Sequence, residues 1–310
     1  MSNGTSARGA SCAVEDPPSG LWRACFRIGE VSLGLSGESD QPPIFGPQIE
    51  LFRSQSETCD IEISLQWVDG LSRRLTPPAF DSGSVWTLHE DKNGLAFDFA
   101  SPAIGPEPYK RLHIDREFRR GLLQLNQSCF PDPAACNPLE YPLDELVVMH
   151  RLGRERGVEV HAVGMRDAAG DGYLFLGHSG AGKSTTARLW TELHDLTVLS
   201  DDRIILRKHA ENIWMHGTPW HGEAAFAAAE KARIQKLFIL EHAPENKITP
   251  ITGSRAVGEI MARSFLPFYD ATALDSTMLF LEEVVAAIPC YRLEFRPDCT
   301  AVEAVRQLKS

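Results

Sequence analysis

Short runs of alternating apolar and polar residues fill the first third of the chain, from Leu21 to about Asn126. Alternation with a period of two residues is typical of half-buried strands. The predicted strands of this region lie at residues 23–28, 60–68, 85–89 and 95–99. Lys92-Asn93-Gly94 lies between the last two and is a strong hairpin signal. The pattern predicts a β-rich N-terminal domain over residues 21–135, with a role in recognition or assembly.

Residues 131–138 carry three prolines in eight positions, which is typical of a linker. Beyond it, the helical spacing of Leu143, Leu146 and Val147 predicts a helix from Leu143 to Arg154. We expect the domain boundary near residues 130–140 and a second domain over residues 140–310. Residues 1–20 are polar and rich in small side chains, so we expect a disordered leader there.

Strand-like and helical stretches alternate in the second domain, which favours an α/β or α+β fold with a mixed sheet. The predicted strands lie at residues 158–165, 172–176, 196–203, 204–207, 213–216, 236–241 and 289–295. The predicted helices lie at residues 185–193, 224–234, 255–265, 272–288 and 301–308. Ser254 is the expected N-cap of the third helix. The fourth carries an apolar stripe that we attribute to core packing.

Composition narrows the classes of partner. The chain has 310 residues, enough for two ordinary domains, and a formal net charge of −11. Nucleic acid is not an expected partner, because phosphate neutralisation needs a basic surface. No apolar run has the length of a membrane span. Seven scattered cysteines without a C-x-x-C pair, and no signal peptide, lead us to expect a soluble cytoplasmic protein with reduced thiols.

One motif carries a specific chemistry. Gly177-His178-Ser179-Gly180-Ala181-Gly182-Lys183-Ser184 fits the phosphate-loop pattern G-x-x-x-x-G-K-[ST], with an apolar strand before it and a helix starting at Thr185. Backbone N–H groups of such a loop surround a phosphate, the lysine neutralises terminal phosphate charge, and the hydroxyl of Ser184 can hold Mg²⁺. The sequence therefore predicts that residues 177–185 bind ATP with Mg²⁺. A glycine-rich turn that binds nothing is the alternative.

Two adjacent carboxylates, Asp201 and Asp202, end the predicted strand that follows the loop helix. We expect this strand to lie beside the phosphate-loop strand, with its carboxyl end at the same edge of the sheet. One of these carboxylates can then hold Mg²⁺, directly or through water, while the other accepts the proton of an attacking hydroxyl. Paired aspartates after a strand are often only a turn or a helix cap, which is the alternative here.

The segment from Gly217 to Glu223 combines glycine and proline with an aromatic ring, a histidine and a carboxylate, as binding loops often do. In one interpretation Trp220 stacks on a base or covers the site, and Glu223 reaches the metal. In the other, the segment is a surface turn that Trp220 anchors in the core. The sequence leaves both open.

The second half, from about His161, resembles the HPr kinase/phosphorylase family and its relatives in peptide-modification gene clusters, the SynChlorMet cassette ScmC-like branch. The matching stretches are VEVHAVG at residues 158–164, GHSGAGKST at 177–185, LSDDR at 199–203, GTPWHGE at 217–223 and PCYRLEFRP at 289–297. The resemblance implies a nucleotide-binding core akin to that of ATP-dependent phosphoenolpyruvate carboxykinase. It also implies phosphate transfer from ATP to a serine hydroxyl.

The resemblance also implies roles for the residues that match the family's motifs. Lys183 would contact the phosphates, Ser184 would bind Mg²⁺, Asp201 would be the base and His161 would be an active-site residue. Outside this resemblance, a lone strand histidine is more often structural. The family's R-G-L-G signature, which follows its metal-binding glutamate, is absent, and Trp214-Met-His-Gly217 stands near that place. Glu223 is the candidate replacement ligand, and we expect either Asp202 or Glu223 to help Ser184 hold Mg²⁺.

These features predict an ATP- and Mg²⁺-dependent kinase that acts on a hydroxyl, with a serine of a peptide or protein as the expected acceptor. Arg203 and Arg255 are candidate cations for the transition state. Three alternatives stay open: a kinase of a small molecule such as free serine, a carboxykinase, and an ATP-binding scaffold in which no phosphate moves. The intact aspartate pair favours a kinase, because a pure binder does not need it. A homo-oligomer is also expected, but the hexamer of true HPr kinases is not carried over, because the N-terminal domain differs from theirs.

Overall fold

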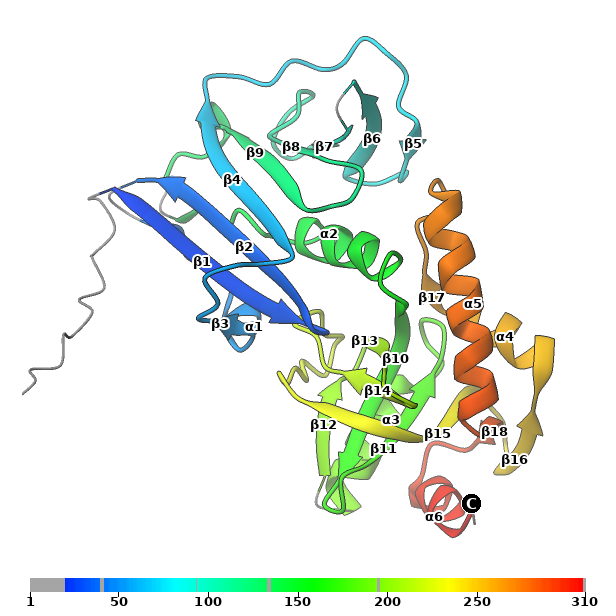
Figure 1. Ribbon diagram of the computed structural model, residues 1–310. Helices are drawn as coiled ribbons and strands as arrows, with labels where there is room; N and C mark the ends of the chain where they lie inside the picture. Colours follow the sequence, from blue (N-terminus) through cyan, green and yellow to red (C-terminus); the bar gives the residue numbers. More distant parts are fainter. Residues whose placement is uncertain (1–19, 40–41, 93, 133–134, 194–195, 309–310) are drawn as a thin grey trace, which may run out of the picture.

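The computed structural model describes residues 20–39, 42–92, 94–132, 135–193 and 196–308. Two large sheets, one from each half of the chain, form its framework, and both contain parallel and antiparallel pairs (Figure 1). This confirms the expected mixed α/β class. The predicted leader lies outside the described residues, apart from Gly20.

The first sheet has the strand order β3-β1-β2-β4-β9-β8-β7-β6-β5. Its strands are β1 (Leu21–Ile28), β2 (Val31–Glu38), β3 (Arg53–Ser54), β4 (Ile61–Val68), β5 (Phe80–Asp81), β6 (Trp86–Asp91), β7 (Gly94–Phe99), β8 (Lys110–Ile114) and β9 (Arg120–Asn126). β6 and β7 pair antiparallel from Trp86 opposite Phe99 to Asp91 opposite Gly94, which confirms the predicted hairpin. A short 3-10 helix, Gln127–Cys129, follows β9.

The first core joins the two halves of the chain. Helix α1 (Pro47–Glu50) and helix α2 (Leu143–Leu152) pack their apolar side chains against the first sheet. Ile205 and Trp220, from the second half, belong to the same buried cluster. Figure 1 shows α2 lying between the two sheets. The predicted boundary near residues 130–140 stays a prediction, and the helix just beyond it packs with the first half.

The second sheet has the strand order β11-β10-β13-β14-β15-β18-β16. Its strands are β10 (Gly157–Asp167), β11 (Asp171–Leu176), β13 (Arg203–His209), β14 (Asn212–His216), β15 (Lys231–His242), β16 (Lys247–Ile251) and β18 (Cys290–Phe295). β12 (Leu196–Ser200) and β17 (Ser264–Phe265) pair with β10. A parallel pairing of β11 with β15 also closes β10, β11, β13, β14 and β15 into a ring.

Helices cover both faces of this sheet. Alternate residues of β11 and β15 point to opposite faces, as the pleat of a strand requires. One face packs against α4 (Gly253–Met261) and α5 (Ala271–Ala287), and the other against α3 (Lys183–Leu193) and α6 (Cys299–Gln307). The apolar stripe predicted in the helix at residues 272–288 packs in the core that lies between this sheet and α4. None of the helices in the described ranges combines the length and apolar character of a membrane span.

The predicted helix at residues 224–234 is wrong. The chain is irregular there until β15 begins at Lys231. The backbone N–H groups of Ala224 and Phe226 donate to the carboxylate of Asp201, and that of Ala228 donates to the carbonyl oxygen of Leu199. Amides engaged in this way are not free to form a helical ladder, so tertiary contacts override the helix propensity of alanine.

The predicted cap and end of the helix around residues 255–265 are also wrong. α4 has Thr252 in the N-cap position and ends at Met261. Ser264 and Phe265 form β17 instead, because they pair with Val160 and Glu159 of β10. The other predicted strands and helices are present, with ends that shift by a few residues.

The strand that carries the aspartate pair is not the direct neighbour of the phosphate-loop strand. β12 and β11 both pair antiparallel with β10, which lies between them. Two strands that are antiparallel to a common neighbour run in the same direction, so the carboxyl ends of β11 and β12 lie at the same edge. The predicted adjacency is wrong, whereas the predicted edge is confirmed. The intervening strand contributes His161 to that edge.

Candidate active site

The predicted phosphate loop, residues 177–184, connects the end of β11 to the first turn of α3. The amine of Lys183 lies inside the loop, where Nζ donates to the carbonyl oxygens of Gly177 at 3.1 Å and His178 at 3.2 Å. Gly182 has a φ of 92°, and a Cβ at this position would lie 2.8 Å from Cζ of Phe295. Only glycine meets both conditions, so the loop's course depends on it.

The remaining predicted phosphate-binding residues lie on the open side of this loop. His178, Ser179 and Gly180 are exposed, and Ala181, Ser184 and Thr185 are half-buried. Because the loop precedes the N-terminus of α3, free backbone N–H groups and the helix dipole favour an anion at this point. Apart from the buried Gly177 and Lys183, the predicted ATP-contacting residues are therefore accessible.

Asp201 is buried, with none of its surface exposed, and accepts four hydrogen bonds. The donors are Oγ of Ser184 at 3.2 Å and the backbone N–H groups of Gly222 at 3.0 Å, Ala224 at 2.9 Å and Phe226 at 3.2 Å. A Cβ at Gly222 would lie 2.8 Å from Oδ2 of this carboxylate, so glycine permits the approach. The Asp201 carboxylate thus fixes the 222–226 segment to the start of α3.

Asp202 is accessible, with 24% of its side chain exposed. Its Oδ1 lies 2.7 Å from Nε2 of His161 and 3.7 Å from Nζ of Lys183, and its Oδ2 accepts from Nη1 of Arg203. Burial alone would raise the pKa of Asp202, but His161, Arg203 and Lys183 outweigh burial and lower this pKa below its ordinary value. Asp202 is therefore an ionised carboxylate at neutral pH, in contact with the phosphate loop.

Arg203 is surrounded by carboxylates. Its Nε lies 2.8 Å from Oε1 of Glu145 and 3.4 Å from Oε1 of Glu159, its Nη1 binds Asp202, and its guanidinium lies 4.1 Å from the ring centre of Phe265. Burial would lower the pKa of Arg203, but the carboxylates raise it above its ordinary value. The guanidinium is therefore fixed in place, and its charge is already shared among acidic groups. Arg255, the other predicted cation, is exposed on α4.

Sequence reasoning missed the acidic groups behind Arg203. Asp144 and Glu145 on α2 and Glu159 on β10 are buried. Burial and the neighbouring Glu145 raise the pKa of Glu159 well above its ordinary value. The signal was present in the sequence, because each carboxylate interrupts an apolar run, and buried carboxylates need a partner.

Sequence reasoning also missed His242, at the carboxyl end of β15. Its Nε2 lies 3.0 Å from the carbonyl oxygen of Gly180, and its ring stacks on Phe295 with 5.3 Å between ring centres. β11, β15 and β18 are parallel, so their carboxyl ends meet at the phosphate loop. A polar residue at the end of a predicted strand was the available signal, but the sequence did not show which strands were parallel.

Trp220 is a core anchor. Only 8% of its surface is exposed, and it belongs to the first core. Its Nε1 donates to Oδ2 of Asp144 at 2.8 Å. Glu223 is exposed, next to Gly222, whose N–H binds Asp201. The structure thus favours the core-anchor interpretation of Trp220.

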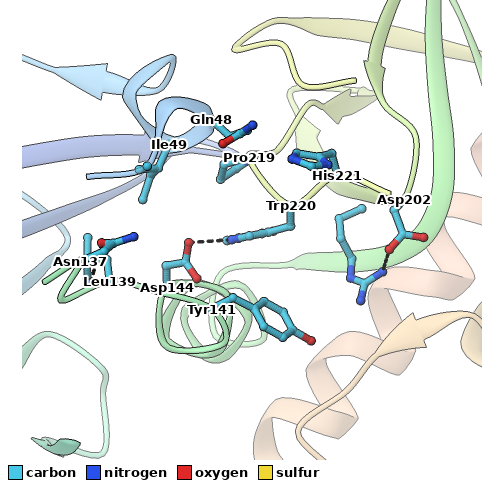
Figure 2. Close-up of a pocket in the computed structure, with 12 residues that line it drawn as sticks. Gln48, Ile49, Asn137, Leu139, Tyr141, Asp144, Asp202, Pro219, Trp220 and His221 are labelled. Atoms are coloured by element: carbon cyan, nitrogen blue, oxygen red, sulfur yellow. Dashed lines mark hydrogen bonds and ion pairs between the residues drawn. The ribbon is translucent and has the colours of Figure 1, made fainter. Parts of the chain in front are cut away.

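A cavity of about 370 Å³ opens beside Asp202 and Arg203. Its walls come from α1 and the residue before it, from the segment leading into α2, and from the loop that carries Trp220 (Figure 2). Figure 2 shows the indole of Trp220 reaching across to Asp144, with Tyr141 on the same side as Asp144. Asp202 lines the cavity and also contacts Lys183, so one carboxylate adjoins both the cavity and the phosphate loop.

Oxygen donors for a magnesium ion lie at the predicted phosphate loop. No group of three or more His, Cys, Asp or Glu side chains suited to a metal occurs among the described residues. The hydroxyl of Ser184 and the carboxylate of Asp201 do lie together at the phosphate loop. Hard oxygen donors of this kind suit Mg²⁺, which usually takes one or two protein ligands, with phosphate and water completing its shell.

The Asp144 carboxyl makes stability depend on pH. Burial raises the pKa of Asp144 to about 7, although the hydrogen bonds from Trp220 and from the backbone N–H of Glu145 act to lower this pKa. A carboxyl with a raised folded-state pKa stabilises the fold most at low pH, and this contribution falls as pH rises towards the folded-state pKa. Relative to Asp144→Asn, wild type is expected to lose on the order of a few kcal/mol of unfolding free energy between about pH 4 and 7. Denaturant unfolding across this range tests it, and a constant difference would contradict it.

Comparison with known proteins does not assign this chain to a family. No protein-family model and no curated protein matches the sequence. Among solved structures, the Hpr(Ser) kinase/phosphatase from Coxiella burnetii aligns with 48% of this chain and 93% of its own, at 13% sequence identity and a TM-score of 0.27. An alignment at this level assigns no role to individual residues, so the roles proposed below rest on contacts within this chain.

Proposed function

We propose that this chain is an ATP- and Mg²⁺-dependent phosphotransferase that transfers the γ-phosphate to a hydroxyl, with a serine of a peptide or protein as the acceptor. The observation that carries the proposal is the contact of Asp202 with both Lys183 and His161 at the mouth of the phosphate loop. Phosphoryl transfer needs positioning and charge neutralisation more than covalent chemistry, and this cluster supplies both.

The donor nucleotide binds on residues 177–185. The loop amides and Lys183 hold the β- and γ-phosphates, and the lysine exchanges its bonds to the Gly177 and His178 carbonyls for phosphate oxygens. Burial lowers the pKa of Lys183, and Asp202 opposes this effect. Ser184, with Asp201, would hold Mg²⁺, which neutralises the charge of the phosphates.

The contacts favour an exchange of the roles that the sequence assigned to the two aspartates. Asp201 is buried and bound to backbone amides, so its carboxylate suits holding the loop and supporting Ser184. Asp202 is accessible, so it suits accepting the hydroxyl proton of the acceptor. His161 is then a positioning residue, because its Nε2 orients Oδ1 of Asp202. Glu223 stays a predicted metal ligand without support from these contacts.

Removal of the loop lysine tests the proposal. The purified chain is incubated with γ-labelled ATP and Mg²⁺, together with HPr, free serine or a serine-containing peptide. Lys183→Ala is expected to lower label transfer by about 10²–10³-fold, because a positioned charge on the phosphates is lost. Lys247→Ala is the matched control, because its side chain is 71% exposed on β16 and should leave transfer unchanged. ATP binding without label on any acceptor would contradict the proposal and favour a scaffold.

A further inference from the structure

We propose that the cavity beside Asp202 is the acceptor site, and that it takes a short uncharged peptide segment held through its backbone amides by Gln48 and Asn137. The inference rests on the proposed function, because it assigns the second substrate of the same site. It gives the first half of the chain a direct part in substrate binding. Four observations carry it: the position, the charge, the polar walls and the volume of the cavity.

The position follows from Asp202. This carboxylate lines the cavity through one part of its surface and lies 3.7 Å from Nζ of Lys183 at the phosphate loop. In phosphoryl transfer the attacking hydroxyl contacts the base and approaches the phosphate from the side opposite the leaving group. A hydroxyl inside the cavity can meet Asp202 without entering the phosphate loop. The cavity is thus where an acceptor can bind at the same time as ATP.

The charge of the walls disfavours an acceptor that carries a carboxylate. Arg203 is the one Arg or Lys among the cavity-lining residues in the described part of the chain, and Glu145 and Asp202 already neutralise it. Asp144 and Asp202 add carboxyl groups to the same walls. The carboxylate of free serine or of a dicarboxylate would meet these groups without a cation to pair with. A serine within a peptide has no such carboxylate.

The polar walls match a peptide backbone. Gln48 lies half-buried at the cavity wall. Oδ1 of Asn137 accepts the Leu139 N–H at 3.2 Å, which leaves the amide nitrogen of Asn137 as a donor. Side-chain amides offer both donors and acceptors, so they can pair with the N–H and C=O groups of an extended segment. Figure 2 labels Gln48 and Asn137, both from the first half, among the residues that line the cavity.

The volume limits the length of that segment. Ligand pockets commonly measure about 300–1,000 Å³, so a cavity of about 370 Å³ lies at the small end of this range. A cavity of this size holds one residue and a few atoms of its neighbours, and it is too small for the surface of a folded protein. Ile49, Leu139 and Trp220 supply apolar contacts around the polar groups. A short segment around the acceptor residue is therefore the occupant that size and chemistry favour.

The test measures binding directly, so that it does not depend on phosphate transfer. Ligand-observed NMR on the full chain compares N-acetyl-Ala-Ser-Ala-amide with free serine at millimolar concentration, and ATP binding is followed on the same samples. We expect the blocked peptide to bind and free serine to bind at least tenfold more weakly. Gln48→Ala is expected to weaken peptide binding by about 3–10-fold, as for one lost hydrogen bond. Gln48→Trp fills the cavity and is expected to abolish it.

Gln66→Ala is the matched control, because it makes the same change on β4, away from the cavity. It should leave peptide binding unchanged. Equal binding of free serine, or peptide binding that survives Gln48→Trp, overturns the inference, and so does the absence of peptide binding to a chain that binds ATP. Peptide binding without label transfer would instead contradict the proposed function alone. The two failures are therefore distinguishable.

Discussion

Asp202→Asn is expected to lower the rate of phosphoryl transfer by about 10²–10⁴-fold, the usual range for loss of a general base. The amide keeps the shape of the carboxylate, but it cannot take up the proton of the acceptor hydroxyl. The side chain is 24% exposed, so the variant should fold and still bind ATP on the phosphate loop. Single-turnover transfer from labelled ATP, with ATP affinity measured separately, isolates this step.

The neighbouring aspartate provides the control. Asp201→Asn presents an amide nitrogen to backbone donors at Gly222, Ala224 and Phe226, so at least one donor loses its acceptor. A buried unsatisfied donor costs about 1–3 kcal/mol, and we expect this loss in the unfolding free energy of the variant. If Asp201→Asn instead folds normally and loses transfer while Asp202→Asn keeps it, Asp201 is the base, as the sequence alone predicted.

Trp220→Ala is expected to lower the free energy of unfolding by about 3–5 kcal/mol, as for other large aromatic truncations in cores. The indole is 8% exposed, packs in the first core and donates to Asp144. Its removal opens a hole in that core and deprives a buried carboxyl of a hydrogen bond. Denaturant unfolding followed by circular dichroism measures the change.

Trp220→Phe separates the two contributions. The phenyl ring keeps much of the packing but has no N–H for Asp144, so this variant is expected to lose only about 1–3 kcal/mol. A Trp220→Ala variant as stable as wild type would show that the loop is not anchored in the first core. Loss of acceptor binding with full stability would instead support the ligand-stacking interpretation of Trp220.

The sequence predicted the strand before residues 177–184, the helix after them and the sheet edge at which the aspartate pair lies, because each follows from local spacing. It did not predict the partners of these residues. Alanine-rich residues 224–234 read as a helix because their preference is local, whereas the hydrogen bonds to Asp201 that prevent one depend on tertiary structure.

The same limit applies to the two aspartates. Adjacent residues in sequence point in different directions, so Asp201 is buried against Ser184 and Asp202 faces His161 and Lys183. Which of them meets an acceptor depends on the pairing of β10 with β12 and β13, which no single-sequence pattern shows. Glu145 and Glu159 were missed for a related reason, since they meet Arg203 only when α2 packs near β10.

The cavity draws much of its wall from one part of the chain and its reactive group from another. Residues 46–49 and 137–144 supply most of the wall formed by the first half, whereas Asp202 and the phosphate loop come from the second. Substitutions in the first set can reshape the cavity without touching a residue that contacts phosphate. Under the proposed function, acceptor preference can therefore diverge by natural selection, or be altered by directed evolution, while the residues that bind the nucleotide stay the same.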